Sequence, residues 1–279
     1  MQPVSRPIGG HLREWRQRRR LSQLALACDA DMSARHLSFI ETGRSLPSRG
    51  MVLRLAERLE VPLRERNLLL VAAGYAPVYP ERPLQDPALE AARKVIDLVL
   101  AGYEPYPALA IDRHWTIVAA NKAFRPLLSG VAPALLRPPV NALRVGLHPA
   151  GLAPRIANLA ELRAHLLARL RRQIDVTGDP ALAGLLTELS EYPTADGGKF
   201  DRPSATGEYD DIVVPLRLVV DGKVLSLISM TTVFGSPVNI TLSEVAIEAF
   251  LPADTATAEA LRRLAPTPNH DPRHGESHV

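Results

Sequence analysis

The sequence is poor in cysteine and has no long apolar run. Its single cysteine, Cys28, excludes an internal disulfide, and this scarcity fits a reducing cytoplasm. No window approaches the run of about 18 apolar residues that a membrane-spanning helix needs. The first ten residues lack the apolar core of a secretion signal. We therefore expect a cytoplasmic protein that has no membrane partner.

Signatures of catalysis are also missing from the sequence. There is no nucleophile-elbow pattern and no phosphate-binding glycine loop, and Cys28 has no identifiable partner that would activate it. Three histidines near the C-terminus are spaced four apart, as metal ligands on a helix would be: His270, His274 and His278. Pro272 and Gly275 argue against a helix there. We expect no enzyme activity, no bound metal and no cofactor.

Positive charge is concentrated in the first third of the chain, which contains no lysine. Residues 1–83 contain 14 Arg against 8 acidic residues, a net charge of +6. The remainder contains 19 basic and 22 acidic residues, a net charge of −3. This asymmetry indicates a polyanionic partner for the N-terminal part. Solvated surface charge would give the same composition, so charge alone does not decide the question.

Apolar periodicity and capping residues predict five short helices in the first 74 residues. They are expected at residues 8–20, 23–29 and 34–42, from 47–48 onward, and after Pro62. Ser22 and Ser33 stand where an N-cap hydroxyl accepts an amide hydrogen bond. Gly43 stands where a left-handed residue ends a helix. The core residues expected in the fifth helix are Leu68, Leu69 and Val71.

A proline-rich stretch, residues 75–87, follows this bundle and predicts a semi-rigid linker. The Asp221-Gly222 pair suits a type I′ turn between two strands. Helices are expected at 88–100, 121–128, 159–174 and 180–192. Strands are expected at 108–111, 116–120, 212–220, 223–234 and 239–250.

These patterns predict an α+β protein with two domains. An all-α helix-turn-helix bundle is expected at residues 1–74, before the linker at 75–87. An α+β domain with an antiparallel sheet is expected at 88–265. The Pro- and His-rich tail at 266–279 is expected to be disordered.

Residues 33–43 have the pattern of a helix that reads DNA. Such a helix is short, exposed on one side and held by a crossing helix. Leu37 and Ile40 are expected to face the core, and Arg35 is the expected direct reader because a guanidinium makes a bidentate contact with guanine. Helix starts and the following loop are expected to contact phosphates. The predicted DNA-binding residues are Gln23, Ser33, Ala34, Arg35, His36, Phe39, Arg44, Ser45 and Arg49.

Together these elements resemble the XRE-type helix-turn-helix family. The matching residues are Leu21-Ser22-Gln23, Leu26-Ala27, Ser33, Leu37-Ser38, Ile40-Glu41, Gly43 and Pro47-Ser48. The resemblance implies a sequence-specific DNA-binding regulator in which Glu41 anchors helices and does not read bases. Arg20 and Asp31 stand where the family often has Gly. Leu24 replaces a commonly polar residue, either as a contact surface or as a single exposed apolar side chain.

The second domain resembles the ligand-binding domain of MmyB-like regulators, which has a PAS-like fold. The resemblance lies in residues 108–121, 141–149, 188–193, 225–237 and 240–254. It implies a bacterial one-component transcription factor whose sensor binds a small apolar molecule, with fatty acyl chains as the suggested class. The expected ligand-binding residues, which would also suit the domain core, are Trp115, Leu227, Met230 and Phe234. No head-group partner is singled out among Arg144, His148, Asn158 and Tyr192.

The expected partners are a double-stranded DNA operator and a second copy of the chain. One reading helix contacts only a few base pairs, so a homodimer on a two-fold operator is expected. The alternative function is a DNA-binding antitoxin or adaptor whose C-terminal domain binds a protein partner. A helical bundle used only for protein contact remains the alternative for the N-terminal domain.

Overall fold

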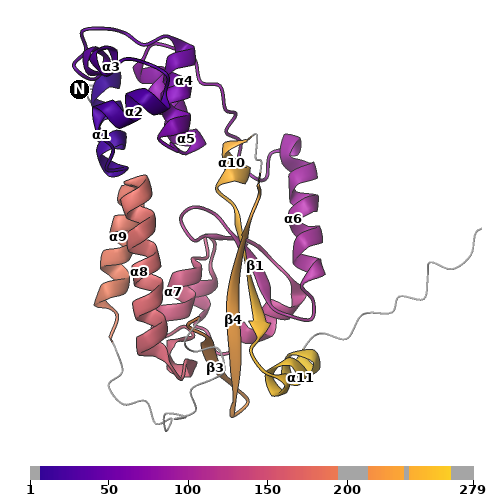
Figure 1. Cartoon of the computed structure of the whole chain (residues 1–279). Coiled ribbons are helices and arrows are strands. Elements are labelled where there is room, and N and C mark those ends of the chain that lie inside the picture. Colours follow the sequence, from indigo (N-terminus) through magenta and orange to yellow (C-terminus); the bar gives the residue numbers. More distant parts are fainter. Residues whose placement is uncertain (1–6, 194–212, 236–238, 265–279) are drawn as a thin grey trace, which may run out of the picture. The chain divides into compact units, whose positions relative to one another are not determined.

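The computed structural model describes residues 7–193, 213–235 and 239–264 (Figure 1). The predicted C-terminal tail and its histidines lie outside these residues. The chain divides into two compact units. The first contains the described residues of 1–90, 170–183 and 234–244, and the second those of 91–169, 184–233 and 245–279. Within the described ranges, every helix is too short or too polar to cross a lipid bilayer.

Five helices form the N-terminal part of the first unit, as the sequence predicts. They are α1 (Ile8–Arg18), α2 (Gln23–Asp29), α3 (Ala34–Glu41), α4 (Arg49–Arg58) and α5 (Leu63–Ala72). The hydroxyls of Ser22 and Ser33 accept hydrogen bonds from the backbone N–H groups of Ala25 and His36, at 3.0 and 3.1 Å. These bonds satisfy amides that have no partner within a helix, and they fix where α2 and α3 begin.

Left-handed residues end the first three helices. Gly43 has φ 75°, while Arg20 and Asp31 have φ 55° and 58° in the positions where the resembling family often has glycine. The backbone therefore keeps the left-handed geometry although neither residue is glycine. For a residue with a Cβ this geometry costs about 1–2 kcal/mol, a cost that Asp reduces by local hydrogen bonding.

Helix α5 differs in detail from its predicted core face. Leu69 and Leu70 are buried, whereas Leu68 and Val71 are 52% and 53% exposed. Consecutive helical residues are separated by about 100° around the axis. When two adjacent helical residues both face the core, the residue before them and the residue after them are rotated away from it. The prediction of Leu68 and Val71 as core residues was therefore wrong.

The first part of the predicted linker packs on the helices. Tyr75 lies against the core of the bundle, and its hydroxyl donates a hydrogen bond to the Pro47 carbonyl at 3.1 Å. The Oδ1 atom of Asn67 on α5 accepts from the backbone N–H groups of Val78 and Tyr79, at 3.0 and 3.1 Å. Residues 75–79 are thus held by α5 and by the segment before α4.

The second unit contains an antiparallel sheet of five strands in the order β2-β1-β5-β4-β3. The strands are β1 (Ala108–Ile111), β2 (Ile117–Ala120), β3 (Leu216–Val220), β4 (Lys223–Val233) and β5 (Ala246–Pro252). Asp221 and Gly222 between β3 and β4 have φ 49° and 75°, the positive values that a type I′ turn needs. The strand predicted at 239–250 begins only at Ala246. Asn239 instead caps the short helix α10 (Ile240–Ser243), because its Oδ1 accepts from the N–H of Thr241.

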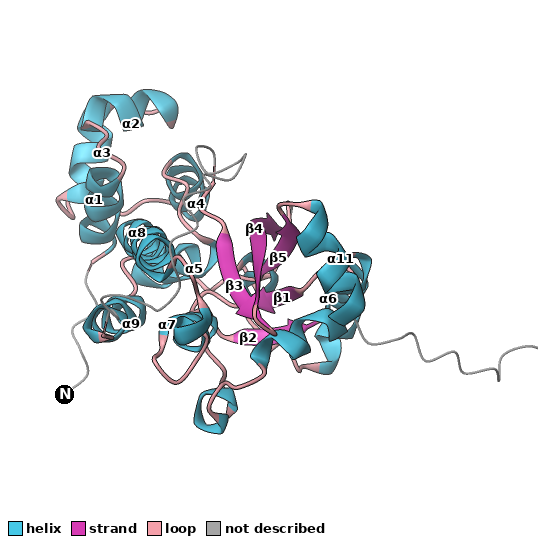
Figure 2. Ribbon diagram, turned by 90° about the horizontal axis from the view of Figure 1, so that it is seen from below, coloured by secondary structure: helices cyan, strands magenta, loops and turns pink. Residues whose placement is uncertain are grey.

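Helices lie on both sides of this sheet. Helix α6 (Glu90–Gly102) lies on the side away from α7 (Ala142–Leu147) and from α8 (Leu159–Thr177), as both views show (Figures 1 and 2). The remaining helices are α9 (Pro180–Glu191) and α11 (Thr255–Leu264). The sequence pattern does not predict α7 or α11. A helix is predicted at 121–128; residues 122–128 form a 3-10 helix that Asn121 caps and that contains Pro126.

Candidate DNA-binding helix and ligand cavity

Helix α3 has an apolar face toward the core and a polar face toward solvent. Leu37 and Ile40 are fully buried, whereas Arg35 is exposed. Because residues four apart share a helix face, Arg35 and Phe39 lie together on the outer side. The guanidinium carbon of Arg35 is 5.4 Å from the centroid of the Phe39 ring. A short helix with an exposed arginine fork is what direct readout in the major groove requires.

The loop after α3 brings a second arginine to Phe39. The backbone N–H groups of Arg44 and Ser45 both donate to the Phe39 carbonyl, at 2.8 and 3.1 Å. The guanidinium carbon of Arg44 is 5.9 Å from the Phe39 ring centroid. Arg49 is also exposed, at the first residue of α4. Of the other predicted DNA-binding residues, Ala34, His36 and Ser45 are half-buried, and the hydroxyl of Ser33 caps α3.

Glu41 ties three segments of the helical bundle together. Its carboxylate accepts hydrogen bonds from Nε and Nη2 of Arg16 on α1, at 2.6 and 2.9 Å. It also accepts one from Nε2 of Gln23 on α2, at 2.8 Å. Arg16 in turn donates to the Leu21 carbonyl at 2.8 Å, so the turn between α1 and α2 joins the same network. Glu41 is only 9% exposed, in agreement with its predicted role as a helix anchor.

This network accounts for two further features of the site. The amide nitrogen of Gln23, a residue predicted to contact phosphate, is already held by Glu41. Burial raises the pKa of the Glu41 carboxyl, but the hydrogen bonds from Arg16 and Gln23 outweigh it, so the pKa lies below its ordinary value. Arg16 was missed at the sequence level because nothing distinguishes it among the arginines of residues 13–20.

Glu41→Gln should lower the free energy of unfolding by about 3 kcal/mol at neutral pH, because it leaves Arg16 partly buried without its counter-ion. A carboxyl with a lowered folded-state pKa stabilises the protein above its ordinary pKa, and that stabilisation is lost as the pH falls through the folded-state value. The variant should therefore approach the wild type as the pH falls below 4.5. Urea unfolding followed by circular dichroism measures both effects. The exposed Glu57→Gln is the control, and equal stability of the two variants at neutral pH would contradict the anchor role.

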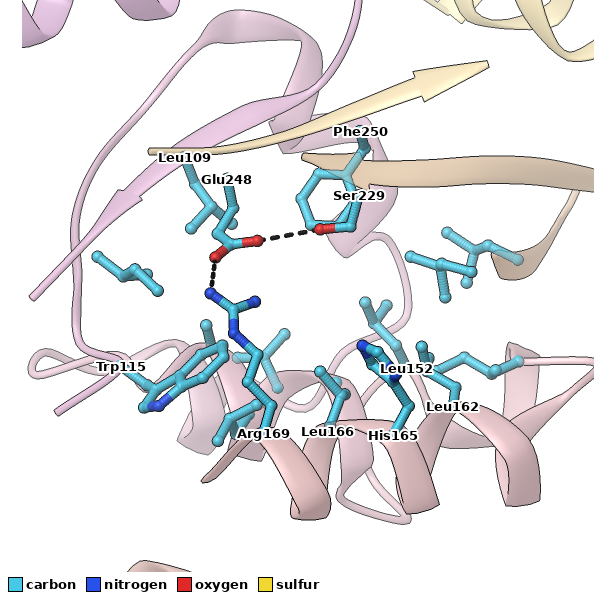
Figure 3. Close-up of a pocket in the computed structure, with 18 of the residues that line it drawn as sticks. Leu109, Trp115, Leu152, Leu162, His165, Leu166, Arg169, Ser229, Glu248 and Phe250 are labelled. Carbon is cyan, nitrogen blue, oxygen red and sulfur yellow. Dashed lines mark hydrogen bonds and ion pairs between the residues drawn. The ribbon is translucent and has the colours of Figure 1, made fainter. Parts of the chain in front are cut away.

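A cavity of about 570 Å³ lies within the second unit, between the sheet and the helices α7 and α8 (Figure 3). Its apolar wall includes Leu109, Ile111, Ile117, Phe124, Leu127, Leu143, Val145, Leu152, Ile156, Leu162, Leu166, Val214, Leu216, Leu218 and Phe250. Its polar lining is small and includes His165, Arg169, Ser229, Thr231 and Glu248. A mostly apolar cavity with few polar groups is typical of small-molecule sites.

The polar groups of the cavity meet in one network. Arg169 extends from α8 toward Glu248 on the central strand β5 (Figure 3), and Nη2 of Arg169 lies 2.5 Å from Oε1 of Glu248. The Glu248 carboxylate also accepts from the hydroxyls of Ser229 and Thr231 on β4, at 3.0 and 2.9 Å. The guanidinium of Arg169 lies 4.6 Å from the ring centroid of Trp115. The network thus joins α8, β4, β5 and the loop between β1 and β2.

The four predicted ligand-binding residues do not come together. Trp115 lines the cavity, but Leu227, Met230 and Phe234 are not part of its lining. Leu227 points to the same side of β4 as Ser229 and Thr231. It lies nearer the start of the strand, however, where it packs against Leu261 of α11. Met230 points to the opposite side of the strand and is 49% exposed. Phe234 follows the end of β4 and belongs to the first unit.

The polar residues left open at the sequence level also lie outside the cavity lining. Arg144 forms a two-point ion pair with Glu188, at 2.8 and 2.6 Å, and Tyr192 donates to the same carboxylate. Burial, followed by this hydrogen bond, raises the pKa of Tyr192 to about 12. The side chain of Asn158 donates to the Pro215 carbonyl before β3 and accepts from the N–H of Arg217 within it. His148 accepts from the backbone N–H of Ala150. The contacts of these four residues all lie within the second unit.

The cavity's polar residues were missed by sequence reasoning, although one signal was present. Glu248 is a lone charge within the apolar strand AIEAFLP, and a buried charge needs a partner. Arg169 is one of several arginines on α8, and nothing in the sequence marks it as that partner. Among the described residues, no cluster of His, Cys, Asp and Glu is arranged to hold a metal ion.

Comparison with known families gives two matches. Residues 7–69 match a family described as a helix-turn-helix domain. Residues 92–264 match the family described as the MmyB-like transcription regulator ligand binding domain, and they make up more than half of the chain. Comparison with curated proteins found no match. The first family implies DNA binding and the second a small-molecule ligand.

Proposed function

The chain belongs to the MmyB-like transcription regulators, and we propose that it is a cytoplasmic one-component regulator that responds to a fatty acyl molecule. Its helix-turn-helix and ligand-binding domains make it a DNA-binding transcription regulator. The observation that carries the ligand proposal is the largely apolar cavity of about 570 Å³ in the ligand-binding domain. Cavities of about 300–1,000 Å³ are usual for small ligands. The walls offer leucine, isoleucine and valine side chains to an acyl chain.

On the DNA side, we propose that α3 reads the operator. Arg35 is assigned to a guanine, and Phe39 or Ala34 to a thymine methyl group, because guanidinium and apolar groups suit these base edges. His36 is assigned to a base edge or a phosphate. Residues at helix starts and in the loop are assigned to phosphates, which set register without reading sequence: Gln23, Ser33, Arg44, Ser45 and Arg49.

Ligand control requires that the ligand bind one arrangement of the DNA-binding helices more tightly than another. Strands β4 and β5 both line the cavity, and the described residues of the segment that joins them, 234–235 and 239–244, belong to the first unit. There Glu244 accepts two hydrogen bonds from Arg64 on α5, at 2.8 and 3.0 Å, and Glu81 pairs with the same arginine. We propose that this connection carries a change at the cavity wall to α5.

We expect the regulator to act as a homodimer on DNA, because one copy of α3 contacts too few base pairs to select a genomic site. Two copies related by a two-fold axis would read half-sites about 10 base pairs apart or a multiple of that spacing. Light scattering on the purified complex with its operator measures the stoichiometry. One protomer on a site without a repeat would contradict this expectation.

Native mass spectrometry of the full chain, purified from cells without added lipid, tests the ligand proposal directly. A fatty acyl mass that co-purifies, and a change of operator affinity when that molecule is removed or restored, would support it. Empty protein whose melting temperature and operator affinity do not respond to fatty acids would refute it. In that case a DNA-binding antitoxin or adaptor that binds a protein partner becomes the better description. A gel shift then shows whether the purified protein binds DNA alone.

A further inference from the structure

We propose that Arg169 and Glu248 form a head-group site in the cavity wall, and that this site selects ligands with an acidic head group. The simplest such group is a carboxylate at the end of an apolar chain. This inference rests on the proposed function, because it assumes that an apolar ligand occupies the cavity. It adds which end of the ligand is recognised and which side chain recognises it.

Most of the acceptor capacity of the buried Glu248 carboxylate is already used. The residue is 4% exposed, and its carboxylate accepts from Arg169, Ser229 and Thr231. A buried carboxylate with three donors is well compensated for its loss of water. A cationic head group would find at most one acceptor position left, on Oε2, and it would meet the positive charge of Arg169 at close range. The network therefore disfavours a cationic ligand.

Arg169 uses only part of its hydrogen-bond donors within the protein. Within the described residues its hydrogen bonds leave from Nη2 alone, to Glu248 and to the Thr231 hydroxyl. Guanidinium carries five N–H donors in a planar fork, so those on Nε and Nη1 are left for a ligand. A ligand carboxylate can accept a charge-assisted hydrogen bond from either of these nitrogens. Most of the hydrogen-bonding capacity that Arg169 and Glu248 leave unused is thus that of a donor, which suits an anion.

Two neighbours hold Arg169 in this orientation. Trp115 lies against the guanidinium, with 4.6 Å between its ring centroid and the central carbon of the group. Glu248 holds Nη2 from the side of the sheet. A donor group that is already fixed loses little conformational freedom when it binds, which strengthens the contact. Glu248 and Trp115 therefore act as positioning residues, and Arg169 is the residue that touches the head group.

Three probes of equal chain length test the inference by titration calorimetry on the full chain: dodecanoate, dodecanol and dodecylamine. We expect dodecanoate to bind at least about tenfold more tightly than dodecanol. The reason is that a hydrogen bond between charged groups contributes at least about tenfold more to the affinity than a hydrogen bond between neutral groups. Dodecylamine should bind most weakly. Arg169→Gln should abolish the preference for dodecanoate over dodecanol, measured as the ratio of the two affinities, while Arg169→Lys should keep part of the preference.

Arg171→Gln is the matched control, because Arg171 is exposed on the same helix and is not part of the cavity lining. Equal binding of dodecanoate and dodecanol would overturn the head-group site but leave the apolar-ligand proposal standing. Tightest binding of dodecylamine would also overturn it and would assign recognition to Glu248. If no probe binds, both proposals fail. Arg169→Lys decides the case in which Arg169→Gln binds neither dodecanoate nor dodecanol. If Arg169→Lys still prefers dodecanoate to dodecanol, the head-group site is supported; if it has lost that preference, the head-group site is contradicted.

Discussion

Arg35→Ala should lose about 1–3 kcal/mol of preference for the operator over other DNA while weak general binding remains. The reason is that Arg35 is the exposed guanidinium on α3, stacked beside Phe39 and aimed away from the buried Leu37 and Ile40. Removing it deletes contacts to one base pair but leaves the phosphate contacts in place. Competition binding with operator and scrambled DNA, at fixed salt concentration, measures the difference.

Arg49→Ala is the matched comparison, because Arg49 is equally exposed but lies at the first residue of α4. It should weaken binding to all sequences alike and reduce the dependence of affinity on salt, as the loss of one phosphate contact does. An unchanged footprint and unchanged preference in Arg35→Ala would show that another face of α3 reads the operator. A loss of preference in Arg49→Ala of the same size would show that the two roles are not separate.

Gly146→Phe should abolish binding of an acyl ligand and leave the domain folded. Gly146 lies in α7 and lines the cavity, and a Cβ at this position would meet no atom within 4 Å. A phenyl group can therefore occupy ligand space without displacing backbone. Replacement of a glycine inside a helix also reduces the entropy lost on folding. Titration with dodecanoate, together with the thermal melting curve, measures both effects.

Gly146→Ala is the control for this substitution, because it makes the same change to the helix but fills little of the cavity. It should retain ligand binding. If Gly146→Phe binds the ligand as tightly as the wild type, the ligand occupies another place. If Gly146→Ala also loses binding, the effect comes from α7 itself and not from the filled volume.

The helical bundle shows how much local sequence determined. Capping by Ser22 and Ser33, the left-handed end at Gly43 and the burial of Leu37 and Ile40 were all predicted from the sequence. The caps and the left-handed end depend on interactions within four residues along the chain, and the buried face of α3 follows from helical periodicity. The Asp221-Gly222 turn is of the same kind, because two adjacent residues with positive φ fix the register of β3 and β4. Both family resemblances also rest on such local patterns.

The ligand site was decided by tertiary structure. Alternation along β4 was visible in the sequence, but it did not show that α11 covers Leu227 or that Met230 points away from the cavity. Arg169 and Glu248 are 79 residues apart, and they meet only because α8 lies across the central strand of the sheet. The sequence by itself determined the division into a helical part and an α+β part, the exposed outer face of α3 and the apolar character of the ligand-binding domain. The position of an ion pair inside a cavity depends on how elements far apart in the sequence pack together. Residue spacing within one element does not determine the distance between two such side chains.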